Sequence, residues 1–175
     1  MSNCWMQTAA GIKFDLLEPD PGMVSITDIA KALGNICRFA GHTGGFYSVA
    51  EHSVLVSRAM ERKNALWGLL HDATEAYVGD LLKSLKIRLP EYRRIEKGIL
   101  DAVVVRFKLQ PYDMPYEVRM ADKKILRDEK QQLLSKTSFD NDWCYEYADP
   151  LGVVIKGWGP QQAASEFLTR YYEVK

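Results

Sequence analysis

The sequence predicts an all-α protein that carries a small β-hairpin near its N-terminus. Apolar residues recur at helical spacing over most of the chain after residue 25, and several of these stretches open with a helix-capping signal. A β-type stretch is confined to residues 5–17, around Gly11. The chain has 175 residues, 47% of them hydrophobic, and shows no repeat or composition break, so we expect a single domain over residues 1–175.

The first half of the chain contains three predicted helices. The sequence "SITD" at 25–28 matches a capping box and predicts that a helix begins there. Glycines in "FAGHTGG" end it. A second helix is predicted over 48–63, with Ser48 as its cap, and a buried third helix over 64–78, which Gly79 stops.

The second half contains three more. Pro90 suits the first turn of a helix, and Pro111 and Pro115 bracket a linker before the helix predicted over 116–134. A short strand is expected at 153–156. A final helix follows the "GP" at 159–160 and carries several aromatic residues.

Composition excludes some classes of function. Lys plus Arg and Asp plus Glu are 23 each, so no charge excess indicates a nucleic-acid or anionic-membrane partner. No stretch resembles a signal peptide or reaches the roughly 18 apolar residues of a membrane span. Cys4, Cys37 and Cys144 are odd in number and lack zinc spacing, so we expect reduced thiols and a cytoplasmic protein.

The stretch "GLLHDATEAYVGD", residues 68–80, concentrates charge in an apolar setting. His71 and Asp72 are adjacent, and Glu75 lies one helical turn after His71. Buried carboxylates are costly unless a cation pairs with them, and residues 64–79 contain no Lys or Arg. Either these side chains face solvent, or a cation reaches them from elsewhere.

Two further residues extend this set. His52 and Asp122 lie on other predicted helices, each at the boundary between an apolar and a polar face. Two imidazoles and two carboxylates form a mixed nitrogen and oxygen set, which suits a divalent ion that keeps positions open for water and substrate. His52, His71, Asp72 and Asp122 are therefore the candidate metal ligands.

The order of these residues resembles the HD-domain superfamily of metal-dependent phosphohydrolases. The blocks "SVAEHSVLVS", "LLHDATEAYVGD" and "ADKKILRDE" match three of its motifs in order, and the likeness covers roughly residues 25–135. Within the superfamily the chain is most similar to small 5'-deoxyribonucleotidases and phage-type deoxynucleotide phosphohydrolases. The resemblance implies an HD-domain helical bundle.

The resemblance also implies substrate contacts. Those relatives carry an arginine and an aromatic residue before the first histidine, here Arg38 and Phe39, and a basic residue after the "GD" pair, here Lys86. This chain lacks the proline expected between Asp80 and Lys86, which leaves the shape of that pocket wall open.

Two neighbours of the aromatic residue complete the candidate substrate site. Gly41 is small and leaves room for a purine. His42 either contacts substrate or holds the glycine-rich loop by a backbone hydrogen bond.

Glu75 and Asp80 are the candidate catalytic residues, since the relatives have site residues at both positions. Glu75 could orient or deprotonate the attacking water, or protonate the leaving oxygen. Asp80 could hold the sugar 3'-hydroxyl or share the proton transfer. Glu129, on the same helix face as Asp122, is either a hydrogen-bond partner of a metal ligand or, more simply, a salt-bridge residue.

The expected activity is removal of 5'-phosphate from 2'-deoxynucleotides by water that a divalent ion activates. Three histidines in the chain favour one metal ion, which could be Co²⁺, Mn²⁺, Zn²⁺ or Mg²⁺. One alternative is a triphosphohydrolase, for example on dATP, in which Arg88, Arg93 or Lys123 would bind additional phosphates. The other is a catalytically silent nucleotide-binding module. Because relatives form dimers or larger assemblies, we also expect a homo-oligomer.

Overall fold

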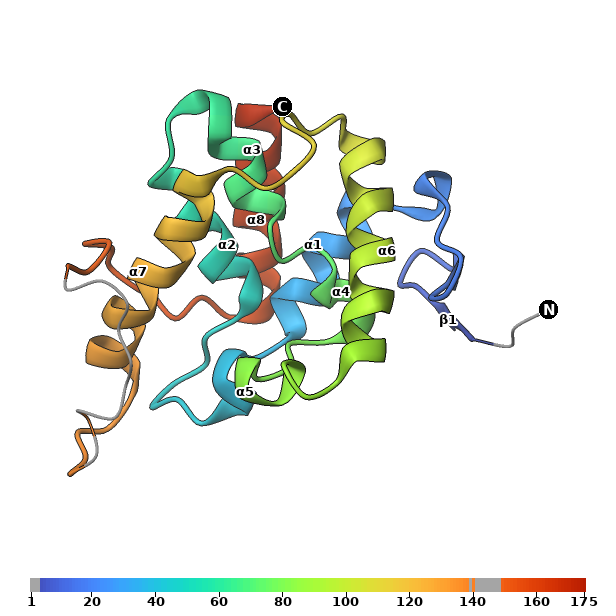
Figure 1. Ribbon diagram of the computed structural model, residues 1–175. Helices are drawn as coiled ribbons and strands as arrows, with labels where there is room; N and C mark the ends of the chain where they lie inside the picture. The colour runs from blue at the N-terminus through green and yellow to red at the C-terminus, as the bar shows by residue number, and fades with distance from the viewer. Residues whose placement is uncertain (1–3, 139, 141–148) are drawn as a thin grey trace.

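The computed structural model describes residues 4–138, 140 and 149–175 (Figure 1). It confirms the predicted all-α fold with a small hairpin near the N-terminus. Cys4 and Cys37 are free thiols, whereas Cys144 lies outside the described residues.

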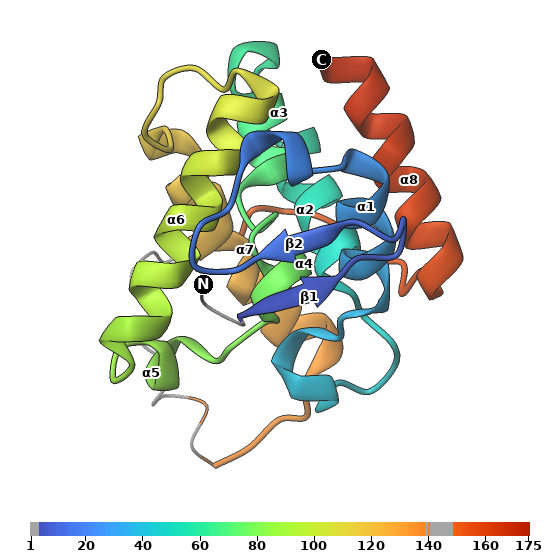
Figure 2. The same cartoon turned by 90° about the vertical axis from the view of Figure 1, so that its right-hand side faces the viewer.

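The hairpin consists of β1 (Trp5–Gln7) and β2 (Lys13–Asp15), which pair antiparallel with Met6 opposite Phe14. The Phe14 side chain is fully buried, and its ring stacks on Tyr77 at a centroid distance of 3.9 Å. In Figure 2 the hairpin lies across α1 (Ile26–Asn35) and α4 (Glu75–Val78), the short helix that contains Tyr77. This stacking attaches the hairpin to the bundle.

The helices begin close to the residues that the capping signals predict. Ser25 and Ser48 each accept a backbone amide in the first turn of the helix that follows. Within the described residues, every helix is either too short or too polar to cross a lipid bilayer. The helices are α1 (Ile26–Asn35), α2 (Val49–Arg58), α3 (Arg62–Leu70), α4 (Glu75–Val78), α5 (Lys83–Lys86), α6 (Pro90–Phe107), α7 (Tyr116–Leu133) and α8 (Pro160–Val174), with 3₁₀ turns η1 (Pro21–Met23) and η2 (Arg38–Gly41).

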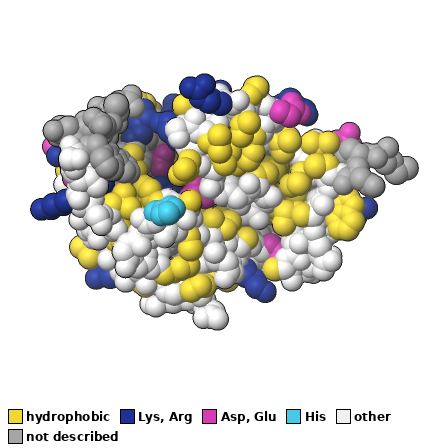
Figure 3. All heavy atoms as spheres, turned by 90° about the horizontal axis from the view of Figure 1, so that it is seen from below, with side chains coloured by type: hydrophobic (Ala, Val, Ile, Leu, Met, Phe, Trp, Pro, Cys, Tyr) yellow, Lys and Arg dark blue, Asp and Glu magenta, His cyan; other side chains and the backbone are white. Residues whose placement is uncertain are grey.

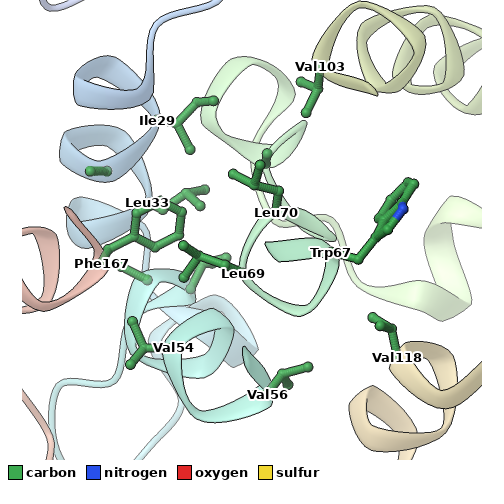
Figure 4. Close-up of a cluster of buried hydrophobic side chains, with 14 of the residues drawn as sticks. Ile29, Leu33, Val54, Val56, Trp67, Leu69, Leu70, Val103, Val118 and Phe167 are labelled. Carbon is green, nitrogen blue, oxygen red and sulfur yellow. The ribbon is translucent and has the colours of Figure 1, made fainter. Parts of the chain in front are cut away.

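Helix α3 lies at the centre of the hydrophobic core. Figure 4 shows Leu69 directed toward Leu33 of α1 and Phe167 of α8, while Leu70 is directed toward Val103 of α6. All five side chains are fully buried. Because α3 contacts neighbours on opposite sides, its apolar residues do not follow a single stripe.

Gly68 lets α3 approach α2 closely. A Cβ at this position would lie 3.0 Å from the Ser57 Cα and 3.1 Å from the Met60 Cγ. The two helices therefore approach each other closely where Gly68 of α3 faces Ser57 of α2.

The prediction of one helix over 64–78 is wrong in its continuity. Helix α3 ends at Leu70, residues 71–74 form a tight turn, and α4 begins at Glu75. In the turn the amides of Ala73 and Glu75 bond to carbonyls three residues back. The His71 side chain also hydrogen-bonds the Gly68 carbonyl at 2.8 Å, which satisfies one of the end carbonyls of α3. The predicted helix over 48–63 likewise ends early, at Arg58.

The strand expected at 153–156 is absent; residues 150–159 have no regular structure. Side-chain carboxylates take the place of a strand partner there. Asp128 accepts the amides of 151–153, and Glu51 accepts those of 156–158 at 2.6–3.1 Å. Sequence periodicity could not reveal these bonds, because they join residues far apart in the chain.

The Glu51 contacts predict a large loss of stability when this carboxylate is removed. Glu51→Ala leaves three backbone amides without their acceptor, so the free energy of unfolding should fall by about 3 kcal/mol. Glu51→Gln keeps one acceptor oxygen and should lose less. Urea unfolding measures both, with the exposed Glu61→Ala as the control; a loss for Glu51→Ala no larger than that of the control would contradict this account.

Candidate metal centre

The four candidate ligands meet at one point between three segments. His52 lies on α2, His71 and Asp72 lie in the turn after α3, and Asp122 lies on α7. One donor atom from each residue lies within 4.8 Å of the others. The two Nε2 atoms are 3.2 Å apart, with Asp122 Oδ1 3.3 Å from the first and Asp72 Oδ2 3.3 Å from the second.

Both imidazoles are oriented by a hydrogen bond to their other nitrogen. Glu129 Oε1 lies 2.8 Å from His52 Nδ1, and the Gly68 carbonyl lies 2.8 Å from His71 Nδ1. An acceptor at Nδ1 fixes the proton there, which leaves the Nε2 lone pair free to bind a cation. Two such lone pairs beside two carboxylate oxygens are the donor set that a divalent ion prefers, so the residues present fit a metal ion.

Arg38 is the cation that reaches the acidic cluster from elsewhere in the chain. Its guanidinium pairs with Glu129, with Nε 3.0 Å from Oε1, and lies 3.6 Å from Asp72 Oδ2. Its side chain is 13% exposed and that of Glu129 is fully buried. The sequence left open whether the acidic side chains face solvent or are paired with a cation from another part of the chain. For Asp72 the second alternative holds, since its side chain is partly buried and lies beside Arg38.

The charges of the cluster shift one another's titration. Burial opposes ionisation of Asp72, yet the adjacent imidazole of His71 lowers the pKa of Asp72 to about 2. Burial likewise opposes charging of His71, but Asp72 and Asp122 raise the pKa of His71 well above its ordinary value. Protons and a divalent ion therefore compete for the same Nε2 positions.

A pocket of about 410 Å³ opens beside this cluster. Figure 3 shows a face on which basic and acidic side chains meet at a hollow beside hydrophobic ones. The residues that line the pocket include most of the predicted site: Arg38, Phe39, Asp72, Glu75, Asp80, Lys86 and Asp122. Tertiary structure therefore brings together candidates that span more than eighty positions of the sequence.

Gly41 and His42 do not line this pocket, and both are exposed. Phe39, Ala40 and Gly41 have φ values of 55°, 50° and 80°, which form a left-handed turn. Such angles are unfavourable for Phe39 and Ala40, whereas Gly41 adopts them readily. The turn aims Phe39 at the pocket, so Gly41 has a backbone role in the structure, and its contact with substrate remains a prediction.

Glu75 is a buried carboxyl in an environment that disfavours its ionised form. It is 5% exposed, and its Oε2 has no hydrogen-bond partner among the residues that the structure describes. Burial, followed by the charges of Asp72 and Asp80, raises the pKa of Glu75 well above its ordinary value. Burial and Asp72 also raise the pKa of Asp80. The tight turn thus separates Asp72, which stays ionised, from Glu75, which can carry a proton.

Lys86 is not a free phosphate-binding cation in this structure. Its Nζ pairs with Glu96 Oε1 of α6 at 2.6 Å and lies 3.9 Å from Glu75 Oε1. Sequence reasoning did not identify Glu96, because α6 follows as a separate helix and its register relative to the pocket is a tertiary property.

Glu129 meets both alternatives predicted for it, since it pairs with Arg38 and its Oε1 lies 2.8 Å from Nδ1 of His52. It also accepts a hydrogen bond at 2.9 Å from the hydroxyl of Tyr47, a residue that the sequence analysis missed. Its spacing from Asp122 on one face of α7 was the available signal. The sequence contained no such signal for Tyr47, because a tyrosine just before a helix cap can equally well be an ordinary core residue.

Comparison with known proteins identifies relatives of the chain. No family model matches it. It is 40% identical to YfdR of Escherichia coli (strain K12) over 129 residues. This alignment covers 74% of this chain and 72% of YfdR. It is 31% identical to RCAP_rcc00048 of Rhodobacter capsulatus over an alignment of 188 positions. This alignment covers 98% of this chain and 96% of that protein. This chain belongs to the YfdR family.

Both relatives are described as uncharacterized proteins, so membership of the YfdR family names no activity. Functional inference for this YfdR-family protein therefore depends on the chemistry of the cluster and the pocket beside it.

The ligand geometry predicts how metal affinity responds to substitution. Asp122→Ala removes a donor and should weaken divalent-ion binding more than about 100-fold. Glu129→Gln keeps the shape but loses the charge that orients His52, and should weaken binding about tenfold. Calorimetric titration of chelator-treated protein measures both, with Glu117→Gln, an exposed change at the start of α7, as the matched control. Wild-type affinity in Asp122→Ala would exclude this cluster as the metal site.

Proposed function

We propose that this protein is a divalent-metal-dependent phosphohydrolase of the HD-domain superfamily that removes 5'-phosphate from 2'-deoxynucleotides. The observation that carries the proposal is the convergence of His52, His71, Asp72 and Asp122 at the edge of a pocket that Glu75 also lines. Burial raises the pKa of this glutamate. A metal ion held by the four ligands would supply Lewis-acid chemistry and activate a water. The preference for deoxynucleotides is supported by the resemblance of the sequence motifs.

Arg38 and Lys86 are the proposed phosphate-binding cations. Arg38 is held by Glu129 and keeps its planar guanidinium on the pocket wall. Lys86 also lines the pocket and is held by Glu96. Prior pairing with a carboxylate preorganises both cations, so that they can stabilise negative charge on the phosphoryl oxygens without reorganising.

Glu75 is the proposed general acid. Water adds to phosphorus while the bond from phosphorus to the nucleoside oxygen breaks, and the leaving oxygen takes the proton from Glu75. The attacking water passes a proton to Asp80, directly or through solvent. The raised pKa of Glu75 favours the acid role over the alternative in which this residue deprotonates the water.

Triphosphate hydrolysis is the second candidate, and the basic residues of the pocket favour it. Lys83 and Lys123 also line the pocket, which would suit a longer phosphate chain. Arg88 and Arg93, the other candidates from the sequence, are exposed and do not line it. A silent nucleotide-binding module has less support, because all four candidate ligands are present and converge.

Cytoplasmic location and a homo-oligomer are proposed together with this activity. Nucleotide substrates are cytoplasmic metabolites, and Cys4 and Cys37 are free thiols. Leu85 and Ile87, at the end of α5, expose 46% and 64% of their surface and would suit a subunit interface. Light scattering on the purified protein tests the oligomer.

Replacing the proposed acid should slow catalysis without removing the metal. We expect Glu75→Gln to lower kcat by about 100-fold to 1,000-fold, while divalent-ion affinity changes little. Because the protonated form is active and its pKa is raised, wild-type activity should fall as pH rises through that pKa, and the variant should lack this decline. Exposed Glu91→Gln is the control; unchanged kcat in Glu75→Gln would contradict the acid role.

The decisive experiment is a product-resolved hydrolysis panel. Chelator-treated enzyme would be resupplied with Co²⁺, Mn²⁺, Zn²⁺ or Mg²⁺ and offered ribo- and deoxynucleoside mono-, di- and triphosphates. Orthophosphate from deoxymonophosphates alone supports the 5'-nucleotidase. Tripolyphosphate, or stepwise phosphate loss from triphosphates, supports the second candidate. Inactivity with every metal, or full activity in Asp72→Ala, contradicts the proposed phosphohydrolase.

A further inference from the structure

The segment that follows α4 supplies much of the wall of the pocket beside the candidate metal centre. Between α4 and α5 the chain has no regular structure, and Asp80 and Leu81 form no backbone hydrogen bond with any residue that the structure describes. The position of Asp80 in the pocket therefore depends on what holds this segment from outside. The residues of the segment that line the pocket are Asp80, Leu81, Leu82, Lys83, Ser84 and Lys86.

Gly79 is the point about which this segment can rotate. Its φ and ψ angles are 81° and 161°, a combination that is open essentially only to glycine. A Cβ there would meet no atom within 4 Å, so no close packing restrains the residue. The Gly79 amide donates to the Glu75 carbonyl at 2.8 Å, which fixes the side toward α4. Rotation about the Gly79 ψ angle then sets the direction of Asp80.

Tyr92 of α6 restrains this rotation. Its hydroxyl donates a hydrogen bond to the Gly79 carbonyl at 3.0 Å. That oxygen belongs to the planar peptide that joins Gly79 to Asp80, so the bond fixes the direction in which Asp80 leaves α4. Burial raises the pKa of Tyr92 to about 12, so the hydroxyl keeps the proton that it donates at neutral pH.

The same side chain also contacts the far end of the segment. The Lys86 Nζ lies 5.7 Å from the centroid of the Tyr92 ring, which is within the range of a cation–π interaction. Glu96, one turn further along α6, pairs with the same ammonium at 2.6 Å. Tyr92 itself does not line the pocket, so its contacts reach the wall from behind.

We propose that Tyr92 is a positioning residue of the candidate site, which acts through Asp80 and Lys86. The proposal rests on the proposed function, in which Asp80 accepts a proton and Lys86 binds phosphate. The hydroxyl of Tyr92 sets the place of the proton acceptor, and its ring supports the phosphate-binding ammonium. Both contributions matter because a displacement of about 1 Å in a reacting group can cost about 100-fold in rate.

Two substitutions separate the hydroxyl from the ring. Tyr92→Phe removes only the hydroxyl, so kcat should fall about tenfold while KM for the nucleotide changes less than about twofold. Tyr92→Leu also removes the ring and should in addition raise KM about threefold, because Lys86 loses its support. Steady-state kinetics on the metal-loaded full chain measures both, and calorimetry should show the divalent-ion affinity of the wild type in each variant.

Tyr112→Phe is the matched control. The Tyr112 hydroxyl also bonds to α6, at 2.9 Å from Asp101 Oδ1, but Tyr112 is exposed and does not line the pocket. The control therefore loses an equivalent hydrogen bond and should keep the kcat and KM of the wild type. Wild-type kcat in Tyr92→Phe, an equal fall in Tyr112→Phe, or a fall that follows a loss of metal affinity would each overturn the proposal.

NMR relaxation tests the positioning without hydrolysis. In Tyr92→Phe the order parameters of the Asp80 and Leu81 amides should fall below those of the wild type, whereas Tyr112→Phe should leave them unchanged. Unchanged order parameters in Tyr92→Phe would overturn the proposal whatever the activity. If the wild type hydrolyses no nucleotide with any metal while these amides respond, the proposed function fails and the positioning of Asp80 by Tyr92 is supported.

Discussion

The buried ion pair between Arg38 and Glu129 is the interaction on which the candidate metal centre depends. It joins the turn η2 to α7, and the same Glu129 carboxylate orients His52 on α2. Without Arg38, Glu129 and Asp72 would be buried negative charges with no strong cation beside them, which proteins rarely tolerate. The pair therefore makes it possible for a protein of this size to keep two histidines and several carboxylates inside a helical bundle.

Carboxylates occupy three different environments in this molecule, which differ in burial and in partners. Glu51 and Asp128 accept backbone amides and hold the segment before α8, so they are structural. Asp72 is paired with cations, which lower its pKa, and this suits the proposed role of metal ligand. Glu75 is buried near other negative charges, which raise its pKa, and this suits the proposed role of general acid.

The tight turn at 71–74 creates this contrast. In one continuous helix His71 and Glu75 would share a face. The turn ends α3 at the ligands and starts a separate short helix, whose first residue faces the large pocket and whose third, Tyr77, stacks under the hairpin. The candidate site and the attachment of the hairpin are thus linked through the four residues of α4.

Much of the fold, and which residues converge at the candidate metal centre, could be predicted from the sequence alone. Capping residues and apolar spacing predicted the helix starts at Ile26, Val49 and Pro90, and the residue types of the histidines and aspartates indicated which side chains suit a divalent ion. These are local properties of the chain. Tertiary structure alone decided that Arg38 pairs with Glu129, that Lys86 pairs with Glu96, and that carboxylates rather than a strand hold residues 151–158. The physical reason is that the free energy of a buried charge depends on partners far away in the chain, and no local pattern encodes them.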